Sequence, residues 1–187
     1  MIQVIDNVIA SRYRNTIEAI FFSDDCYWNF NPNVSGDNKT KQVGLSHQII
    51  YDFKHYSKHV DFLLPLVFEI SDKSNVNFDA IMQARAFLQP ASSCEYNNDV
   101  FHIDVFKNHM VFLYYVNDSD GDTIILNKKY GDEQPSFLDR NYNKEDILEK
   151  VTPKKGRVVV FDGHYYHAAG IPHTSHRCIL NFNVIKH

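Results

Sequence analysis

The 187-residue sequence contains few cysteines and no long run of apolar residues. Its three cysteines, Cys26, Cys94 and Cys178, lie far apart and form no Cys-x-x-Cys pair, which argues against a thiolate zinc site. So low a number is typical of a reducing compartment. The longest apolar run, FLLPLVF, is much shorter than the roughly 20 residues of a membrane-spanning helix. We therefore expect a soluble, cytoplasmic protein without a membrane partner.

A basic excess and a secretory signal are also absent. The formal net charge is −4, whereas proteins that bind phosphate backbones usually present a positive surface. The charge therefore argues against nucleic acid as a partner. No long apolar segment follows a basic one near the N-terminus, so the sequence predicts no signal peptide.

Apolar and aromatic residues are plentiful, at 44% and 14% of the chain, which is enough for a sizeable core. The length predicts a single domain covering 1–187. Helical periodicity dominates the first part, about 1–76. There the expected elements are a strand at 2–7, helices at 9–22, 45–57 and 60–71, and a polar surface loop at 31–42.

Short strand-like runs separated by turn signals dominate the second part, about 77–187. Helices followed by antiparallel strands predict a mainly β protein with N-terminal helices, in the α+β class, built on a sandwich or jelly roll. We expect the helices to pack outside one sheet. The expected strands are 78–89, 99–106, 109–117, 121–127, 156–163 and 177–185, with a helical piece at 143–151.

The run VFHIDVF carries the first chemical signal. Side chains alternate along a strand, so His102 and Asp104 face one side while Phe101 and Ile103 face the other. A solvent-exposed hydrogen-bonded pair is one reading, and a shared metal ion is the other, because burying both groups unpaired is costly. Two histidines and one carboxylate would leave three open positions, which suits non-haem Fe(II).

The C-terminal run RCILNFNV carries the second signal. Its alternation places Cys178, Leu180, Phe182 and Val184 on an apolar face and Arg177, Ile179, Asn181 and Asn183 on the opposite face. An inward arginine normally meets an anion, although a surface salt bridge remains the alternative.

The order of these signals resembles the Fe(II)/2-oxoglutarate-dependent oxygenase superfamily. His102-x-Asp104 is followed by a histidine 65 residues later and by Arg177 ten residues after that. FLYYVNDSDGDTIIL and PKKGRVVVFDGHYYHAAGIPHTSHRCILNFNV are similar to its prolyl-hydroxylase-like branch and to small phage and bacterial relatives. The resemblance covers about 77–184 and implies a double-stranded β-helix, the jelly roll.

The resemblance also implies roles for individual residues. His102, Asp104 and His167 would bind Fe(II), and Arg177 would pair with the distal carboxylate of 2-oxoglutarate. Tyr115 would hydrogen-bond the same carboxylate, with a core aromatic as the alternative, and Asn181 and Gln89 would lie in the cosubstrate pocket.

Four histidines cluster in FDGHYYHAAGIPHTSHRC. His167 has the family's spacing to Arg177, and its HxxG context after FDG matches the family's distal segment. His173 falls in the expected hairpin, and His176 adjoins Arg177 and faces the opposite way. His164 is odd-spaced from His167 and remains open as a residue of the substrate mouth.

The activity that the resemblance implies is a dioxygenase using Fe(II), 2-oxoglutarate and O2. It would hydroxylate a C–H bond of a peptide or protein side chain and release succinate and CO2. A carboxylate at Asp104 favours hydroxylation over halogenation, because halogenating relatives have a small residue there. The alternatives are a hydroxylase of a free amino acid or other small metabolite, a non-catalytic jelly-roll module, and a cupin-type hydrolase or isomerase.

Overall fold

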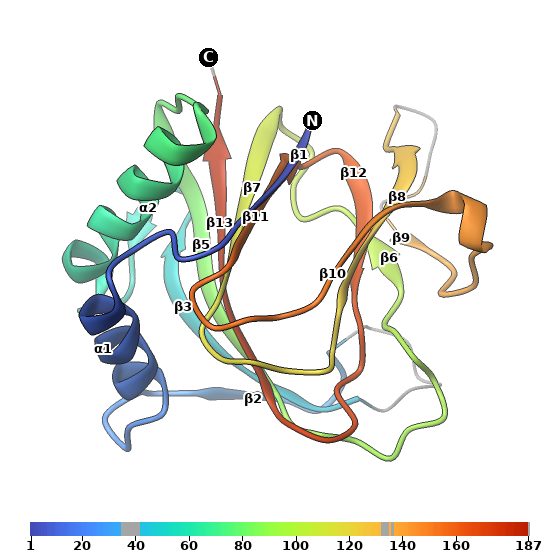
Figure 1. Cartoon of the computed structure of the whole chain (residues 1–187), viewed down its shortest axis with the longest axis horizontal. Helices are drawn as coiled ribbons and strands as arrows, with labels where there is room; N and C mark the ends of the chain where they lie inside the picture. The colour runs from blue at the N-terminus through green and yellow to red at the C-terminus, as the bar shows by residue number, and fades with distance from the viewer. Residues whose placement is uncertain (35–41, 132–134, 136, 187) are drawn as a thin grey trace.

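The computed structural model describes residues 1–34, 42–131, 135 and 137–186. They form two antiparallel sheets that face each other, with two α-helices outside the larger sheet (Figure 1). The protein is therefore mainly β with helices near the N-terminus, as the sequence predicts. The elements are β1 (Ile2–Ile5), α1 (Ser11–Phe21), β2 (Asn29–Asn31), β3 (Gly44–Tyr51), β4 (Lys54–His55), α2 (Val60–Ser74), β5 (Ala80–Gln89), β6 (Phe101–His102), β7 (His109–Tyr115), β8 (Thr123–Lys129), β9 (Phe137–Leu138), the 3-10 turn η1 (Lys144–Asp146), β10 (Ile147–Val151), β11 (Val158–Asp162), β12 (Tyr165–Ala169) and β13 (Arg177–Ile185).

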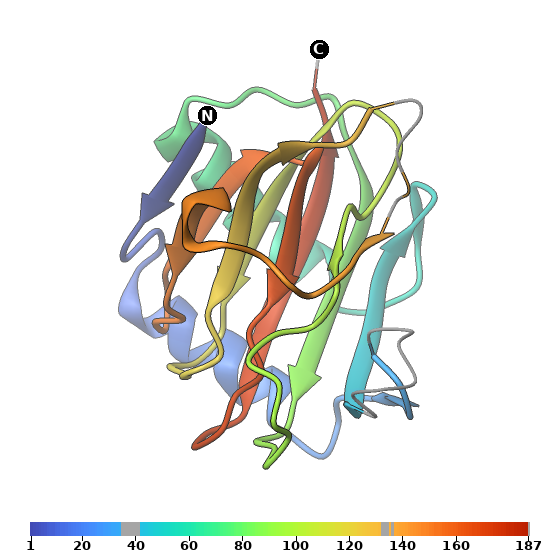
Figure 2. The same cartoon turned by 90° about the vertical axis from the view of Figure 1, so that its right-hand side faces the viewer.

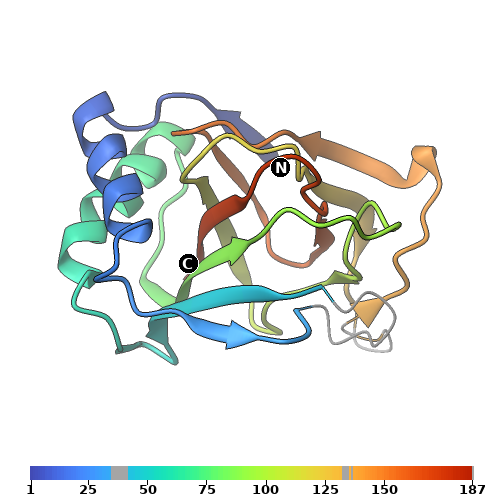
Figure 3. The same cartoon turned by 90° about the horizontal axis from the view of Figure 1, so that it is seen from below.

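The larger sheet has the strand order β1-β11-β7-β13-β5-β3-β2, and β4 also pairs with β3. Its outer face packs against α1 and α2, which lie to one side of it in Figures 1 and 3. Strand alternation supplies this apolar face, as β13 illustrates. The predicted core residues of that strand are all buried there: Cys178, Leu180, Phe182 and Val184.

The smaller sheet has the order β10-β8-β12-β6-β9 and faces the viewer in Figure 2. A second apolar cluster lies between the two sheets and includes Leu113, Ile125 and Ile179. Ile179 shares its face of β13 with Arg177 and Asn181, so these polar side chains are also buried between the sheets. These buried polar side chains place the candidate site between the two sheets.

The helix predicted at 45–57 is wrong. The segment forms β3 and β4, joined by a turn in which Asp52 and Phe53 have positive φ angles of 46° and 62°. Its apolar residues fit helical spacing, but β3 pairs along its length with β5, and this long-range pairing overrides the local pattern. The larger sheet therefore contains one more strand than predicted, β3, which lies next to β5, the strand that carries Arg85 and Gln89.

The helix predicted at 143–151 is also wrong. Only the 3-10 turn η1 forms there. The remainder is β10, which pairs with β8 and is the edge strand of the smaller sheet. The helices predicted at 9–22 and 60–71 are confirmed as α1 and α2. Pro65 lies in the second turn of α2. Neither helix of the described residues is long and apolar enough to cross a bilayer.

The strand predicted at 99–106 is shorter than expected. Only Phe101 and His102 pair as β6, and Asp104 lies just beyond the end of the strand. The predicted alternation still holds for Phe101 and Ile103, which are buried in an apolar cluster on the other side of the smaller sheet. Most of the polar loop at 31–42 lies outside the described residues.

Candidate metal centre

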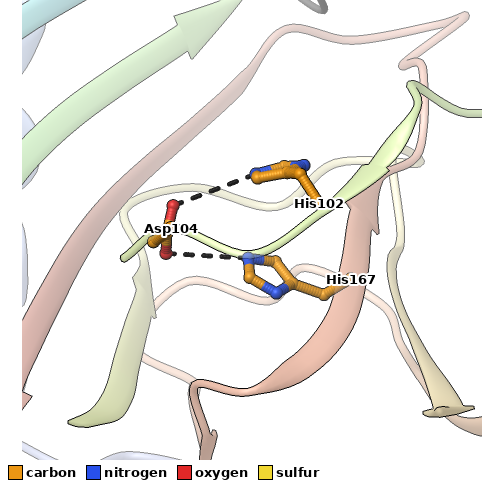
Figure 4. A group of neighbouring side chains, drawn as sticks. All are labelled: His102, Asp104 and His167. Atoms are coloured by element: carbon orange, nitrogen blue, oxygen red, sulfur yellow. Dashed lines mark ion pairs between the residues drawn. The ribbon is translucent and has the colours of Figure 1, made fainter. Parts of the chain in front are cut away.

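Strand pairing brings His102 and His167 together. β12 pairs with β6 so that His167 stands directly opposite His102, and the two ring centroids are 4.7 Å apart. Asp104 reaches toward both rings (Figure 4): its Oδ1 lies 3.9 Å from His102 Nε2, and its Oδ2 lies 3.6 Å from His167 Nε2. One possible ligand atom from each residue falls within 4.8 Å of the others, so the three could share one ion.

The backbone fixes the orientation of both imidazoles. His102 Nδ1 lies 3.2 Å from the carbonyl oxygen of Val100, and His167 Nδ1 lies 3.0 Å from that of Tyr165. A carbonyl only accepts hydrogen bonds, so each Nδ1 carries the proton and donates it. Each Nε2 therefore presents its lone pair toward Asp104, which is the arrangement of a metal-ligating histidine and its outer partner.

The protonation states also suit a cation. Removal from water, aided by the neighbouring His167, lowers the pKa of His102 to about 4. Burial alone would raise the pKa of Asp104, but its close contact with His167 and the charge of the nearby Arg85 hold this pKa well below the usual value. At neutral pH, His102 is thus neutral and Asp104 is ionised, as metal ligands must be. This donor set fits a divalent metal such as Fe(II).

Two further side chains hold Asp104, although it lies outside the strand. Asn181 donates an amide N–H to Oδ2 at 2.9 Å, and Arg85 Nη2 lies 3.5 Å from Oδ1. The carboxylate side chain is only 2% exposed. Asn181 was predicted to lie in the cosubstrate pocket. It lines the cavity, and its hydrogen bond fixes the carboxylate of Asp104, one of the candidate metal ligands.

Arg177 is fully buried on the same inner face. It donates from Nε to the Gly121 carbonyl at 2.8 Å, from Nη1 to Gln89 Oε1 at 3.2 Å and from Nη2 to Thr123 Oγ1 at 2.8 Å. All three acceptors are neutral, so these hydrogen bonds do not balance the charge of the guanidinium. A buried cation of this kind is costly unless an anion joins it.

Tyr115 reaches this cation through Thr123. Its hydroxyl donates to Thr123 Oγ1 at 2.7 Å, and its ring centroid lies 5.8 Å from the guanidinium carbon of Arg177. Burial raises the pKa of Tyr115 to about 12, so the hydroxyl stays protonated. Thr123 Oγ1 accepts from both Tyr115 and Arg177, which leaves its own proton free for a third partner.

One cavity of about 290 Å³ joins the two groups. It is lined by His102, Asp104 and His167 at one place and by Arg177, Gln89 and Thr123 at another. A larger hollow of about 620 Å³ lies elsewhere, between α2 and β5, and none of the predicted site residues lines it. The smaller cavity therefore contains the chemistry, although the larger one has more space.

The other three histidines of the C-terminal cluster lie outside this group. His164 Nδ1 lies 3.7 Å from Asp162, His173 contacts the carbonyl of Ser92 at 3.0 Å, and the ring of His176 packs against Phe22. Of the four histidines, only His167 pairs with a residue of β6, where it stands opposite His102.

Sequence reasoning did not assign to the site three polar residues that line the cavity: Arg85, Asp99 and Thr123. Thr123 could have been found from the alternation of β8, which places it on the same face as the buried Ile125. Asp99 begins the strand predicted at 99–106, and no local pattern distinguishes it from an ordinary polar residue at the end of a strand.

Gly163, in the turn before β12, lies very close to the side chain of His109. A Cβ on Gly163 would lie 1.9 Å from Nε2 of the buried His109, so Gly163→Ala must push the ring or the start of β12 aside. We expect it to lower the free energy of unfolding by about 1–3 kcal/mol, as overpacking does. Chemical denaturation measures this change.

Gly131→Ala is the matched control, because a Cβ there meets no atom within 4 Å among the described residues. Equal stability of the two variants would show that the segment leading to His167 is not held in this way.

A scan against protein-family models finds no match, and a search of curated proteins finds none either. Solved structures do match over the whole chain. A 2OG-Fe(II) oxygenase family oxidoreductase from Burkholderia pseudomallei is 11% identical, with a TM-score of 0.70 over 100% of this chain and 86% of its own. A Pseudomonas putida prolyl-4-hydroxylase is 13% identical, with a TM-score of 0.63 over 100% and 92%.

A third match is HygX from Streptomyces hygroscopicus, solved with nickel and 2-oxoglutarate bound. It is 10% identical, with a TM-score of 0.62 over 99% of this chain and 82% of its own. At such identities the likeness concerns the fold, which does not by itself define a reaction. The chain has the fold of the 2-oxoglutarate–Fe(II) oxygenases.

Proposed function

We propose that this chain is an Fe(II)- and 2-oxoglutarate-dependent dioxygenase that hydroxylates a C–H bond. We infer that residues 1–187 form one domain whose two sheets make the double-stranded β-helix. The observation that carries the proposal is the single cavity lined both by the group His102, Asp104 and His167 and by the buried cation Arg177. A structural jelly-roll module has no need for either group, and a cupin-type hydrolase has no need for the cation.

His102, Asp104 and His167 would hold the iron through two imidazole Nε2 atoms and one carboxylate oxygen. Bound there with 2-oxoglutarate, the iron supplies the oxidising chemistry that turns the cosubstrate into succinate and CO2. The chain's own part is to orient these ligands. The Val100 and Tyr165 carbonyls fix the two rings, and Asn181 fixes the carboxylate.

Arg177 would bind the distal carboxylate of 2-oxoglutarate. The guanidinium keeps its neutral acceptors, and the incoming anion balances its charge. Thr123 has a free hydroxyl proton to donate to the same carboxylate, and Tyr115 positions Thr123 through its 2.7 Å hydrogen bond. Tyr115 would thus act through Thr123, and Ile179 on the same cavity wall would keep water away.

For the substrate, we propose a peptide or protein side chain. The support is the fold likeness to prolyl hydroxylases, including one from Trichoplax adhaerens solved with a hypoxia inducible factor peptide fragment, which is 12% identical with a TM-score of 0.63 over 99% of this chain and 83% of its own. Phe137 on β9 is exposed, and its ring centroid lies 6.1 Å from that of His102. It therefore offers an apolar surface beside the proposed metal site.

One observation favours the second candidate, a small metabolite with a carboxylate such as a free amino acid. Arg85 lines the cavity, its side chain is 39% exposed, and its one ionic contact among the described residues is with Asp104. When the Asp104 carboxylate coordinates a metal, its negative charge is partly neutralised, and Arg85 would then pair with an anionic substrate close to the metal site.

Anaerobic titration with Fe(II) and then 2-oxoglutarate tests the proposal. We expect a weak visible charge-transfer band in the wild type and none in His102→Ala. Absence of the band in the wild type, or an undiminished band in the variant, would contradict the assignment. Products heavier by 16 Da, sought after incubation with peptide and metabolite pools, would then separate the two substrate classes.

A further inference from the structure

A buried carboxylate lies beside the proposed cosubstrate pocket. Asp99 precedes β6, is only 4% exposed and lines the same cavity as Arg177. Its backbone N–H donates to the Ala169 carbonyl on β12 at 2.9 Å, so its position is fixed by the smaller sheet. The proposed ligand set does not include it. Among the described residues its Oδ1 has no hydrogen-bond partner, although buried carboxylate oxygens normally have one.

Gln89 links this carboxylate to Arg177. The amide oxygen of Gln89 accepts from Arg177 Nη1 at 3.2 Å, and its nitrogen donates to Asp99 Oδ2 at 3.0 Å. The guanidinium can only donate, so it fixes which end of the amide faces Asp99. Asp99 is therefore one amide away from the cation to which the cosubstrate would bind.

The charged groups around Asp99 come from two directions. Arg177 approaches from β13, and Arg140 approaches from the segment after β9. Gln89 on β5 and Thr123 on β8 are neutral, and Asp122 just before β8 is paired with Lys150 at 3.1 Å. The other carboxylate that lines the cavity is Asp104. Burial raises the pKa of Asp99 to about 6 in spite of the two arginines and the hydrogen bond from Gln89.

A second carboxylate beside Arg177 would change this balance. With Asp99 ionised, one negative charge already lies near the guanidinium, and a carboxylate of 2-oxoglutarate would add another in a poorly solvated place. Like charges at such a site raise the affinity of one of them for a proton. Asp99 can accept that proton from solvent. Its bare Oδ1 then becomes a hydroxyl donor instead of an unpaired acceptor.

We propose that Asp99 couples cosubstrate binding to a proton: a carboxylate of 2-oxoglutarate occupies the place beside Arg177 together with one proton taken up by Asp99. The inference rests on the proposed function, because it assigns the anion that Arg177 binds to 2-oxoglutarate. Asp99 would then disfavour anions that cannot bring about this protonation, which makes it a specificity residue of the pocket.

Calorimetric titration of 2-oxoglutarate into the Ni(II)-loaded protein tests the coupling without turnover. Measured at pH 7.5 in buffers with different ionisation enthalpies, wild type should take up about one proton per bound molecule. Its dissociation constant should rise about tenfold per pH unit between pH 7 and 8, because ionised Asp99 must be protonated at increasing cost.

Asp99→Asn keeps the shape and an acceptor for Gln89 but cannot titrate. We expect its proton uptake to fall to nearly zero, and its affinity at pH 8 to exceed that of wild type by at least about tenfold, since the protonation cost is gone. Asp61→Asn, on the exposed side of α2, is the matched control and should behave as wild type.

The outcomes separate the two proposals. If 2-oxoglutarate does not bind the wild type, both the proposed function and the coupling fail. If it binds without proton uptake, or with equal uptake in Asp99→Asn, the coupling alone is overturned. Carboxyl NMR of the Zn(II)-loaded wild type needs no variant: Asp99 should titrate near pH 6 without 2-oxoglutarate and above pH 8 with it, and an unmoved titration would overturn the coupling.

Discussion

His167→Ala is expected to abolish tight metal binding, whereas His164→Ala, three residues away on the same segment, leaves it unchanged. His167 Nε2 faces Asp104 at 3.6 Å and its ring stands opposite His102, while His164 contacts Asp162. Removing a ligand should cost more than the about 10- to 100-fold in affinity that loss of an outer partner costs. Competition of Fe(II) or Zn(II) with a coloured chelator measures the difference.

The pair of variants is informative because both remove one imidazole from a cluster of four. A loss of affinity shared equally by His164→Ala would place the metal nearer the start of β12 and contradict the assignment. Without metal, His167→Ala should be the less stable variant, because it removes a buried ring that packs against Phe161 and donates to the Tyr165 carbonyl. Thermal denaturation therefore checks that both variants are folded before their metal affinities are compared.

Asn181 is expected to matter through Asp104. Asp104 lies beyond the end of β6, so strand pairing does not fix its carboxylate, and the 2.9 Å hydrogen bond from Asn181 does. The metal group therefore depends on both sheets: two of its side chains come from the smaller sheet, and the third is oriented by β13 of the larger sheet. The contact with Asp104 explains why β13 carries a buried polar amide, Asn181, on its inner face, although the outer face of the strand is apolar.

The sequence predicted the two faces of β13 better than it predicted some of the elements around that strand. The alternation of β13 identified both Arg177 on its inner face and Leu180 on its outer face, because period two is a local property of a strand. The helix at 45–57 was wrong because β3 is held by hydrogen bonds to β5, more than thirty residues later, which local spacing does not reveal.

Alternation could have placed Thr123 on the inner face, but the contacts of Thr123 and Asp99 depend on several strands and could not be predicted from the sequence. Thr123 matters because β8 brings its hydroxyl to the side chains of Tyr115 and Arg177, which lie on two other strands. Asp99 matters because β5 places Gln89 between it and Arg177. In both cases the residue type is ordinary and the contact is made only by the assembled sheets. The same strand pairing also determines the effect of removing Arg177.

Arg177→Met is expected to weaken 2-oxoglutarate binding by at least about 30-fold, since truncating one partner of a buried charge pair costs about 2–5 kcal/mol. Metal affinity should stay within a few-fold of wild type, because Arg177 contacts Gln89, Thr123 and Gly121 and none of the three proposed ligands. Calorimetric titration of 2-oxoglutarate into the Ni(II)-loaded protein measures the first affinity, and titration of Ni(II) into the metal-free protein measures the second.

The apo protein supplies the control for Arg177→Met. In wild type without 2-oxoglutarate, the guanidinium donates to three neutral acceptors and lies near the ionised Asp99, so Arg177→Met leaves these groups without their cationic partner. We therefore expect a moderate loss in the free energy of unfolding, about 1–3 kcal/mol. A large loss of stability, or equal losses of metal and 2-oxoglutarate binding, would mean that Arg177 maintains the fold rather than binding the cosubstrate.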